Sequence, residues 1–398
     1  MDNIHYFCQG ESHKSNDKPC QDYAYSESSE TLSMAIVSDG HGGERYFRSH
    51  IGSELAVNIT KDAIRTFVQN IELEFADAKN GLSIFEGQSF TSFSQASASE
   101  QQYSSKVHQS LTWLFSSIIS QWNIAIEQDA REHELSQWEI ENIEQQYIDD
   151  FKAKLGQGNA SFEKIYGCTL MAYVCTPKYW FAFHLGDGKC VALHLNNGIV
   201  TLSQPIPWDE KCFLNKTTSL CDSYALEEFR YCLQGDNSND FPIAVFLGSD
   251  GLDDTFGDGE NLYNFYIQLF KIIIKDGKDV ALKELSESLP ILSQKGSKDD
   301  MSVACIYSTE NLKTILPKLV EYQLKVSTEK FNRIEDKILD LENKLSNRED
   351  MGNIGQKEKI NIEYARKDLT KSKEQAKLFH NKIEILKHEL TDGVNDLE

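Results

Sequence analysis

An aspartate, a glycine and a histidine follow one another at the end of an apolar segment. The run Leu32 to Val37 leads into Ser38-Asp39-Gly40-His41-Gly42-Gly43. A strand that ends on a carboxylate, beside a glycine that lets the backbone approach a ligand, suits a metal-assisted reaction. A histidine two residues further on can move a proton in such a reaction. This segment therefore predicts an active-site corner at the end of a strand.

Further aspartates occupy similar places at strand ends or in short loops: Asp22, Asp187, Asp250 with Asp254, and Asp299. Carboxylates at the ends of several strands can meet across a cleft. Two Mg²⁺ or Mn²⁺ ions would need such a set of oxygen ligands, completed by waters. The alternative is that these are ordinary turn aspartates, which any acidic chain contains. The recurrence of the layout in several strand-end segments favours the metal site.

The overall charge restricts the partners of the chain. Its 398 residues carry a formal net charge of −22, and 40% of them are apolar. Phosphate backbones and anionic membranes are bound by clustered lysine and arginine, so we expect neither nucleic acid nor a membrane as a partner. Some of the carboxylates are instead expected to serve as ligands of hard cations.

The N-terminal residues and the cysteines indicate the compartment. The segment Met1 to His5 lacks the basic start and apolar stretch of a signal peptide, and no apolar run has the length of a membrane span. The nine cysteines show no metal-binding spacing, and several lie in strand-like runs, so we interpret them as reduced and mostly buried. The expected location is cytoplasmic.

Hydrophobic periodicity predicts the elements that position the aspartates. We expect strands at 2–9, 167–176, 179–187, 189–196, 198–203, 243–247 and 301–307, helices at 44–78, 106–155 and 260–290, a mobile loop at 83–105, and an irregular segment with weak strands at 205–240. This order is not a regular alternation of strands and helices. It favours an α+β fold with two mostly antiparallel sheets and helices outside them, an α-β-β-α sandwich.

The last ninety residues have a different composition, rich in Lys, Glu, Asn and Leu. Apolar residues recur in steps of three and four over 320–345 and again over 362–390, as in the seam of a coiled coil. Gly352 and Gly355 lie between the two seams. An antiparallel helical hairpin is one interpretation, and a parallel dimeric coiled coil with a break is the other. We expect a domain boundary near residue 308, with 1–308 as one domain and 309–398 as the helical tail.

In this order the acidic motifs resemble those of the PP2C-type metal-dependent serine/threonine phosphatases. The resemblance rests on Gln21-Asp22, Asp39-Gly40-His41-Gly42-Gly43, Gly167-Cys168-Thr169, Gly186-Asp187-Gly188, Ser249-Asp250-Gly251-Leu252-Asp253-Asp254 and Ser297-Lys298-Asp299-Asp300-Met301-Ser302-Val303. It covers roughly residues 1–308. Gly10-Glu11-Ser12-His13 and Pro19-Cys20-Gln21-Asp22 are most similar to the bacterial branch.

The resemblance implies a role for each matching residue. Asp39 would bridge two Mg²⁺ or Mn²⁺ ions, and Gly40 would offer its carbonyl oxygen to one of them. Asp22 would hold the second ion, and Asp250 with Asp299 would complete the shell of the first. Asp187 with Asp254 matches a third, weaker ion site of some family members. His41 would act as the general acid for the departing serine or threonine oxygen, after attack on phosphorus by a hydroxide between the metals.

The sequence departs from the family pattern at two positions. Many members have a phosphate-binding arginine where this chain has Asp17, so His13, Lys14 or Lys18 would have to supply the charge. His13 matches the bacterial branch best. Asp300 stands where asparagine is usual, and its carboxylate would either tighten metal binding or face solvent.

Two functions remain open on the sequence alone. The first is a phosphatase that hydrolyses phosphoserine and phosphothreonine in proteins and so opposes a serine/threonine kinase. The second is a pseudophosphatase that binds a phosphorylated partner and assembles through its tail. For the tail, dimerisation, docking of a partner and bracing of the catalytic domain are alternatives. The sequence identifies neither the substrate protein nor the choice between Mg²⁺ and Mn²⁺.

Overall fold

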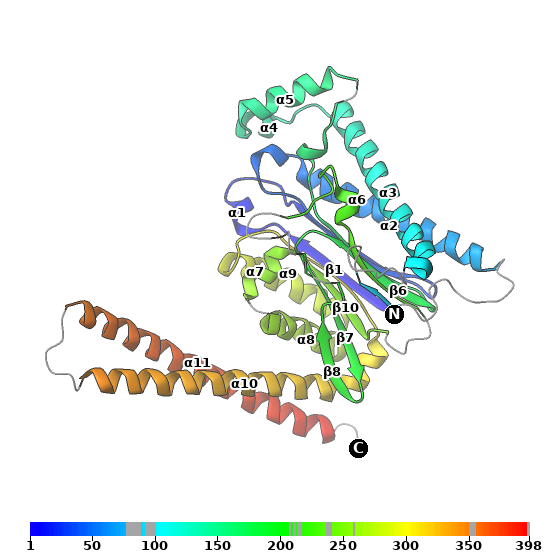
Figure 1. Ribbon diagram of the computed structural model, residues 1–398. Helices are drawn as coiled ribbons and strands as arrows, with labels where there is room; N and C mark the ends of the chain where they lie inside the picture. The colour runs from blue at the N-terminus through cyan, green and yellow to red at the C-terminus, as the bar shows by residue number, and fades with distance from the viewer. Residues whose placement is uncertain are drawn as a thin grey trace. The chain divides into compact units, whose positions relative to one another are not determined.

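The computed structural model describes residues 1–76, 89–91, 101–158, 160–206, 208–209, 212, 217–235, 241–257, 259–349 and 356–395 (Figure 1). The chain forms two compact units. One consists of 1–195 and 201–312, and the other of 196–200 and 313–398. Within the described residues, no helix is long and apolar enough to cross a membrane.

Two antiparallel sheets form the centre of the first unit. The strands are β1 (Asp2–Cys8), β2 (Asp22–Ser28), β3 (Ser33–Asp39), β4 (Ser89–Thr91), β5 (Leu170–Cys175), β6 (Tyr179–Leu185), β7 (Lys189–Asn196), β8 (Ile199–Ser203), β9 (Arg230–Gly235), β10 (Ala244–Gly248) and β11 (Met301–Tyr307). One sheet has the order β1-β11-β10-β7-β8, and the other β2-β3-β5-β6-β9-β4. The α+β prediction is confirmed, and β11 has the bounds expected from the sequence.

Side chains alternate between two cores along the central strands. On β3, Met34 and Ile36 join the core beneath the outer helices, whereas Ala35 and Val37 join the core between the sheets. Residues 170–175 of β5 divide in the same way. Successive side chains of a strand point to opposite faces, so strands without polar alternation must be covered on both sides. This explains the continuous apolar runs in the sequence.

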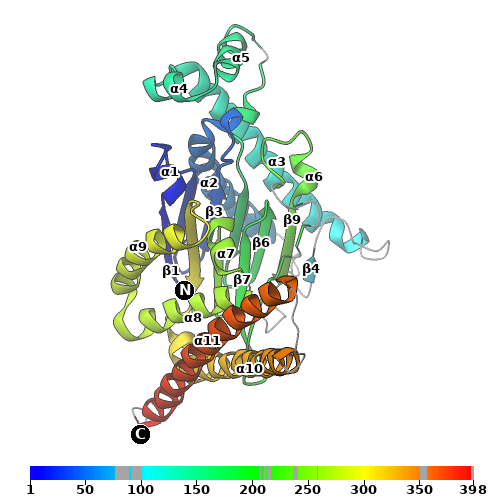
Figure 2. The same cartoon turned by 90° about the vertical axis from the view of Figure 1, so that its left-hand side faces the viewer.

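Helices cover the outer face of each sheet (Figures 1 and 2). Besides two helices described below, the helical elements of this unit are α1 (Glu11–Lys14), η1 (Glu44–Tyr46), α2 (Ser49–Ala76), α3 (Gln101–Glu132), η2 (Glu163–Ile165), α6 (Ala225–Glu228), α7 (Asp250–Phe256), α8 (Gly259–Asp276) and α9 (Lys278–Lys295). The helices α2 and α3 lie along the six-stranded sheet, where Trp122 Nε1 donates to the Gly52 carbonyl at 3.0 Å. On the other sheet, Phe246 of β10 stacks on Tyr266 of α8 with ring centroids 3.9 Å apart.

The structure corrects the helix expected at 106–155. That segment contains α3, α4 (Gln137–Asn142) and α5 (Gln145–Leu155). The break at 133–136 has a local cause, because Ser136 caps α4. Its hydroxyl accepts from the Glu139 amide at 3.1 Å, and the Glu139 carboxylate accepts from the Ser136 amide. This reciprocal capping box begins a new helix. A prediction from hydrophobic spacing alone misses this start, because the capping residues are polar.

The segment expected as a mobile loop and the segment expected as irregular with weak strands both contain regular structure. In the expected mobile loop 83–105, residues 89–91 form β4 and α3 begins at Gln101, while 83–88 and 92–100 lie outside the described residues. In the segment 205–240, β9 is an interior strand that pairs with both β6 and β4. Its pairing partners lie about 50 and 140 residues away in the chain, so no local pattern reveals its position in the sheet.

Arg48 ties α4 to the start of α2. Only 2% of Arg48 is exposed, and its Nε donates to Glu139 Oε1 at 2.7 Å. A second nitrogen donates to the Tyr166 hydroxyl at 3.2 Å. A buried carboxylate left without its partner is strongly destabilising, because its solvation is not replaced.

We therefore expect Arg48→Ala to lower the free energy of unfolding by about 3–5 kcal/mol in urea titrations. Arg65→Ala is the matched control, since Arg65 also pairs with carboxylates but is 42% exposed. The control should cost less than about 1 kcal/mol. Equal losses in the two variants would contradict the assignment of Arg48 as a buried tie.

The second unit contains two long helices, α10 (Thr309–Glu349) and α11 (Gln356–Asn395), which run antiparallel within one chain. The Phe331 and His380 rings have centroids 6.0 Å apart, and Lys373 Nζ lies 2.6 Å from Glu342 Oε1. Residues further along α10 therefore meet residues further back along α11. This is the arrangement of the hairpin interpretation.

All nine cysteines are unpaired, as expected, and eight are buried. Cys20 is the half-buried exception.

Candidate active site

Asp22 and Asp39 face each other at one end of the six-stranded sheet. They are direct partners in the antiparallel register of β2 and β3. The Asp39 amide donates to Thr169 Oγ1 at 3.0 Å, and its carbonyl accepts from the Thr169 amide at 2.8 Å. These bonds fix the strand end at which the Asp39 carboxylate projects.

Gly40 follows in a crowded position. Its amide donates to the Gln21 carbonyl at 3.0 Å. A Cβ atom at this position would lie 2.7 Å from the carbonyl oxygen of Ser49 and 2.9 Å from that of Gln21. Such contacts exclude any larger residue without a backbone shift. The glycine lets three chain segments meet directly behind the two aspartates.

The other sheet contributes Asp250. It follows β10 as the first residue of α7, and Ser249 and Ser302 exchange hydrogen bonds that hold this turn against β11. Asp250 and Asp39 line the same small cavity between the sheets. The structure thus brings together carboxylates from two sheets, which the sequence predicted only as strand-end residues.

The pKa values of these aspartates are raised because the carboxyl groups are buried close to one another. Burial raises the pKa of Asp22 well above its usual range, and the neighbouring Asp300 carboxylate adds to this. Burial also raises the pKa of Asp39, with further contributions from Asp22 and Asp250. The pKa of Asp250 rises to about 7, mainly by burial. Charges placed this close repel one another unless a cation lies between them.

The remaining predicted ligands lie around this cluster. Burial raises the pKa of Asp299, Asp187 and Asp254, and the charge of Asp254 contributes to the shift of Asp187. Asp254 is on α7, one turn after Asp250, and Asp187 follows β6. Lys189 Nζ lies 3.5 Å from Asp253, the residue before Asp254.

Asp300 holds two chain segments together, and its burial corrects one of the two alternatives considered from the sequence, that it faces solvent. It is 3% exposed, so it does not face solvent. Its carboxylate accepts from the amides of Gly10 and Gln21, each at 2.5 Å, and lies 2.8 Å from His13 Nδ1. These donors hold the N-terminal segment against the loop before β11. All of these contacts bridge more than 270 residues of chain, which explains why the sequence did not reveal them.

The two residues predicted to bind phosphate differ in environment. His13 is buried, and its Nδ1 contacts Asp300, whereas Lys14 is exposed on α1. Asp17, at the position of the missing arginine, is exposed in a left-handed conformation with φ 51°. The role of His13 and Lys14 in phosphate binding stays a prediction.

His41 is held by backbone contacts beside Asp39. Its amide donates to the Gly167 carbonyl at 3.0 Å, and its carbonyl accepts from Ser49 Oγ at 2.9 Å and from Gln21 Nε2 at 3.1 Å. Burial lowers the pKa of the His41 imidazole to about 4. The sequence analysis named Gln21 only as part of a motif and did not name Ser49, and both side chains position the neighbouring backbone here.

The donor set suits a hard divalent cation. The ligand candidates are carboxylate oxygens and the Gly40 carbonyl, which Mg²⁺ and Mn²⁺ prefer. Asp22 is 2% exposed, and its Oδ2 has no hydrogen-bond partner within the described part of the chain. In that same part, no three His, Cys, Asp or Glu side chains already surround one point as a complete metal site. A buried carboxylate oxygen that has no hydrogen-bond partner and lies among other acids nevertheless has the chemistry of a cation ligand.

A family model described as Protein phosphatase 2C matches residues 9–289. The chain belongs to the protein phosphatase 2C family. It is accordingly a protein serine/threonine phosphatase, of a family that depends on Mg²⁺ or Mn²⁺. No curated protein sequence matches this phosphatase.

Solved bacterial phosphatases share similarity with this chain at low sequence identity. The serine/threonine phosphatase Stp1 from Staphylococcus aureus is 14% identical, with 77% of this chain and 95% of that chain covered and a TM-score of 0.39. The Mycobacterium tuberculosis phosphatase PstP/Ppp is 12% identical, with 76% and 97% covered and a TM-score of 0.38. The catalytic domain of PstP in complex with two manganese ions is 14% identical, with 76% and 96% covered and a TM-score of 0.39.

Proposed function

We propose that this phosphatase hydrolyses phosphoserine and phosphothreonine in proteins at the aspartate cluster, with two Mg²⁺ or Mn²⁺ ions, and thereby opposes a serine/threonine kinase. The observation that supports this most directly is the meeting of Asp39 with Asp22 across a strand pair and with Asp250 across the two sheets. Buried carboxylates collected in this way repel one another, and a bound cation would compensate that repulsion. The cytoplasmic location stays a prediction.

In this proposal each residue of the cluster has a separate role. Asp39 would help to hold both ions, together with the Gly40 carbonyl and Asp22. Asp250 and Asp299 complete the set, and Asp187 with Asp254 offers a third, weaker site. Two bound cations would lower the pKa of a water between them and so supply the nucleophile at neutral pH.

His41 provides the proton in this proposal. The departing serine or threonine oxygen is strongly basic, so it leaves readily only when it is protonated. Burial keeps the imidazole neutral in the free protein, as its lowered pKa indicates. A phosphate dianion bound beside it would favour the cationic form, because an opposite charge stabilises the protonated imidazole.

The experiment that tests the proposal is phosphate release from a phosphothreonine peptide and from p-nitrophenyl phosphate. Activity should require added Mn²⁺ or Mg²⁺ and should be abolished by a chelator. The Asp39→Asn protein is the matched control. A wild-type protein as inert as this variant, with metal in excess, would contradict the proposed function.

We further propose that residues 1–308 form the catalytic domain and that the helical tail, 309–398, serves assembly, either as a dimer or by docking a partner. A protein truncated after residue 308 should retain its activity on p-nitrophenyl phosphate to within about twofold, because every proposed ligand precedes that position. Light scattering on the full and truncated proteins measures dimerisation. A truncated protein that is folded but inactive would show that the tail belongs to the catalytic domain.

A further inference from the structure

Side chains from separate segments gather beside His41. The ring of Tyr46 meets the His41 ring edge-on, with centroids 4.7 Å apart. A Cβ atom on Gly167 would lie 2.8 Å from Cys221 Sγ, 2.8 Å from Tyr46 Cδ1 and 2.9 Å from His41 Cδ2. Glycine is therefore needed at position 167, and His41, Tyr46 and Cys221 surround the same small volume.

Two cations extend this group toward solvent. Lys164 Nζ lies 3.7 Å from Cys221 Sγ and 2.9 Å from Asp222 Oδ1, and 48% of its side chain is exposed. The Arg45 guanidinium lies over the Tyr46 ring, 4.4 Å from its centroid, and Arg45 is exposed. The contact with Asp222 orients the Lys164 ammonium, which has three donors and can bind a second acceptor. In a chain of net charge −22, these cations offer a local site for an anionic group.

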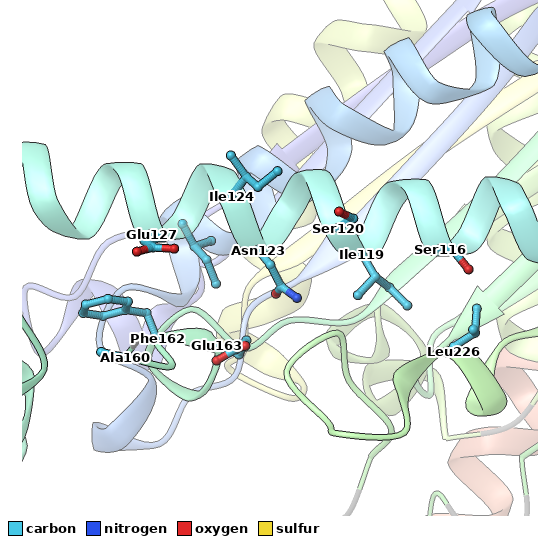
Figure 3. A pocket seen from close by; sticks show the side chains of 11 residues that line it. Ser116, Ile119, Ser120, Asn123, Ile124, Glu127, Ala160, Phe162, Glu163 and Leu226 are labelled. Carbon is cyan, nitrogen blue, oxygen red and sulfur yellow. The ribbon is translucent and has the colours of Figure 1, made fainter. Parts of the chain in front are cut away.

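A pocket of about 450 Å³, which we name the α3 pocket, lies between α3, the segment directly before Lys164, and α6. Its lining includes Ile119, Ser120 and Asn123 of α3, Phe162 and Glu163, and Leu226 of α6. Glu163 directly precedes Lys164, and Leu226 follows Asp222 by four residues. In Figure 3, Ile119 and Asn123 point from α3 toward Leu226 and Glu163.

The lining of the α3 pocket suits a stretch of polypeptide. Ile119, Phe162 and Leu226 offer an apolar surface to a side chain. Asn123 Oδ1 is buried and has no hydrogen-bond partner among the described residues. A buried acceptor without a partner costs free energy, and a peptide N–H entering the pocket would satisfy it.

We propose that Arg45, Lys164 and the α3 pocket together bind the polypeptide that flanks the phosphorylated residue. The cations select an anionic side chain close to the phosphorylated residue, and the α3 pocket accepts an apolar side chain further along. A carboxylate and a second phosphate group both supply the anion. This inference rests on the proposed function, because His41 and the aspartates fix where the phosphorylated residue lies.

The charge preference is tested with phosphothreonine peptides that differ only in flanking residues: glutamate, phosphoserine, glutamine or lysine. For the wild-type protein, kcat/KM should be about three- to fivefold higher with glutamate than with lysine beside the phosphothreonine, as for exposed ion pairs. The phosphoserine peptide distinguishes the two sources of the anion, since its extra charge should give the larger preference.

Charge variants then assign the preference to the proposed residues. Lys164→Glu should reverse the ranking of the glutamate and lysine peptides, and Asp222→Asn should strengthen the preference for glutamate. Lys178→Glu makes the same charge change at the exposed β5–β6 turn and should leave the ranking as in the wild type. All three variants should retain their activity on p-nitrophenyl phosphate. An unchanged ranking in Lys164→Glu would overturn the inference.

The α3 pocket is tested by filling it. Ser120→Phe should raise KM about fivefold for a peptide that carries leucine downstream of the phosphothreonine, with little effect on a glycine counterpart. Ser117→Phe, on the same helix but outside the pocket lining, is the control. Equal effects of the two variants would exclude the pocket as the docking site.

Binding separates failure of this inference from failure of the proposed function. Fluorescence anisotropy of labelled phosphopeptides with the Asp39→Asn protein measures the same rankings without turnover. If the wild-type protein releases no phosphate but the Asp39→Asn protein ranks the peptides as described, the proposed function is contradicted and the docking surface is supported. An active protein that shows no preference among the peptides would support the proposed function and contradict the docking surface.

Discussion

Replacing Asp39 with asparagine is expected to lower kcat for a phosphothreonine peptide by about 10³-fold or more. A metal ion contributes several kcal/mol of charge stabilisation to a transition state, and each 1.4 kcal/mol corresponds to a factor of ten. Asp39 lies opposite Asp22 in the strand register and lines the same small cavity as Asp250, so the substitution removes the carboxylate that these two acids share.

The same substitution is expected to stabilise the metal-free protein. The pKa of Asp39 is raised in the folded state above its ordinary value of 3.8. Its contribution to stability is therefore fully present below pH 3.8 and is lost as the pH rises through the folded-state pKa. Asparagine carries no charge and avoids this loss.

Thermal unfolding in the presence of a chelator measures this effect. The melting temperature of Asp39→Asn should exceed that of the wild type by an amount that grows as the pH rises above 4. Adding Mn²⁺ should raise the melting temperature of the wild type more than that of the variant. Asp276→Asn, an exposed aspartate at the end of α8, is the control and should change neither activity nor the pH trend. A variant that is less stable than the wild type at every pH would contradict the account of repelling acids.

Replacing His41 with glutamine is expected to separate two substrates. Turnover of a phosphothreonine peptide should fall by about 10²–10⁴-fold, the usual contribution of a general acid. Turnover of p-nitrophenyl phosphate should fall by less than about tenfold, because nitrophenolate is a stable anion that leaves without a proton. Glutamine retains a polar group at the position, so the backbone contacts of His41 with Gly167 and Ser49 can persist.

Steady-state rates on both substrates at saturating Mn²⁺ test this expectation. His133→Gln is a suitable control, because His133 is exposed and contacts Asp129 away from the aspartate cluster. An equal loss on both substrates would show that His41 only supports the structure of the corner. A loss confined to the peptide would identify His41 as the proton donor.

The sequence by itself determined the fold class and the identity of the candidate ligands. Strands such as β11 and β10 are visible in the local sequence as apolar runs bounded by turn residues. Their bounds were therefore predicted to within a residue. The aspartates follow these runs directly, and their positions at strand ends were therefore visible as well. The family resemblance added roles to residues that were already singled out by type and spacing.

Only the tertiary structure decided which side chains meet. The pairing of Asp22 with Asp39 depends on strand register, and a shift of one residue would turn each to the opposite face. The buried position of Asp300 depends on donors supplied from the N-terminal segment, since a carboxylate is buried at acceptable cost only when such donors are present. The contact of Lys164 with Asp222 likewise joins residues 58 positions apart. Contacts of this kind are set by the folded chain, and no local pattern in the sequence encodes them.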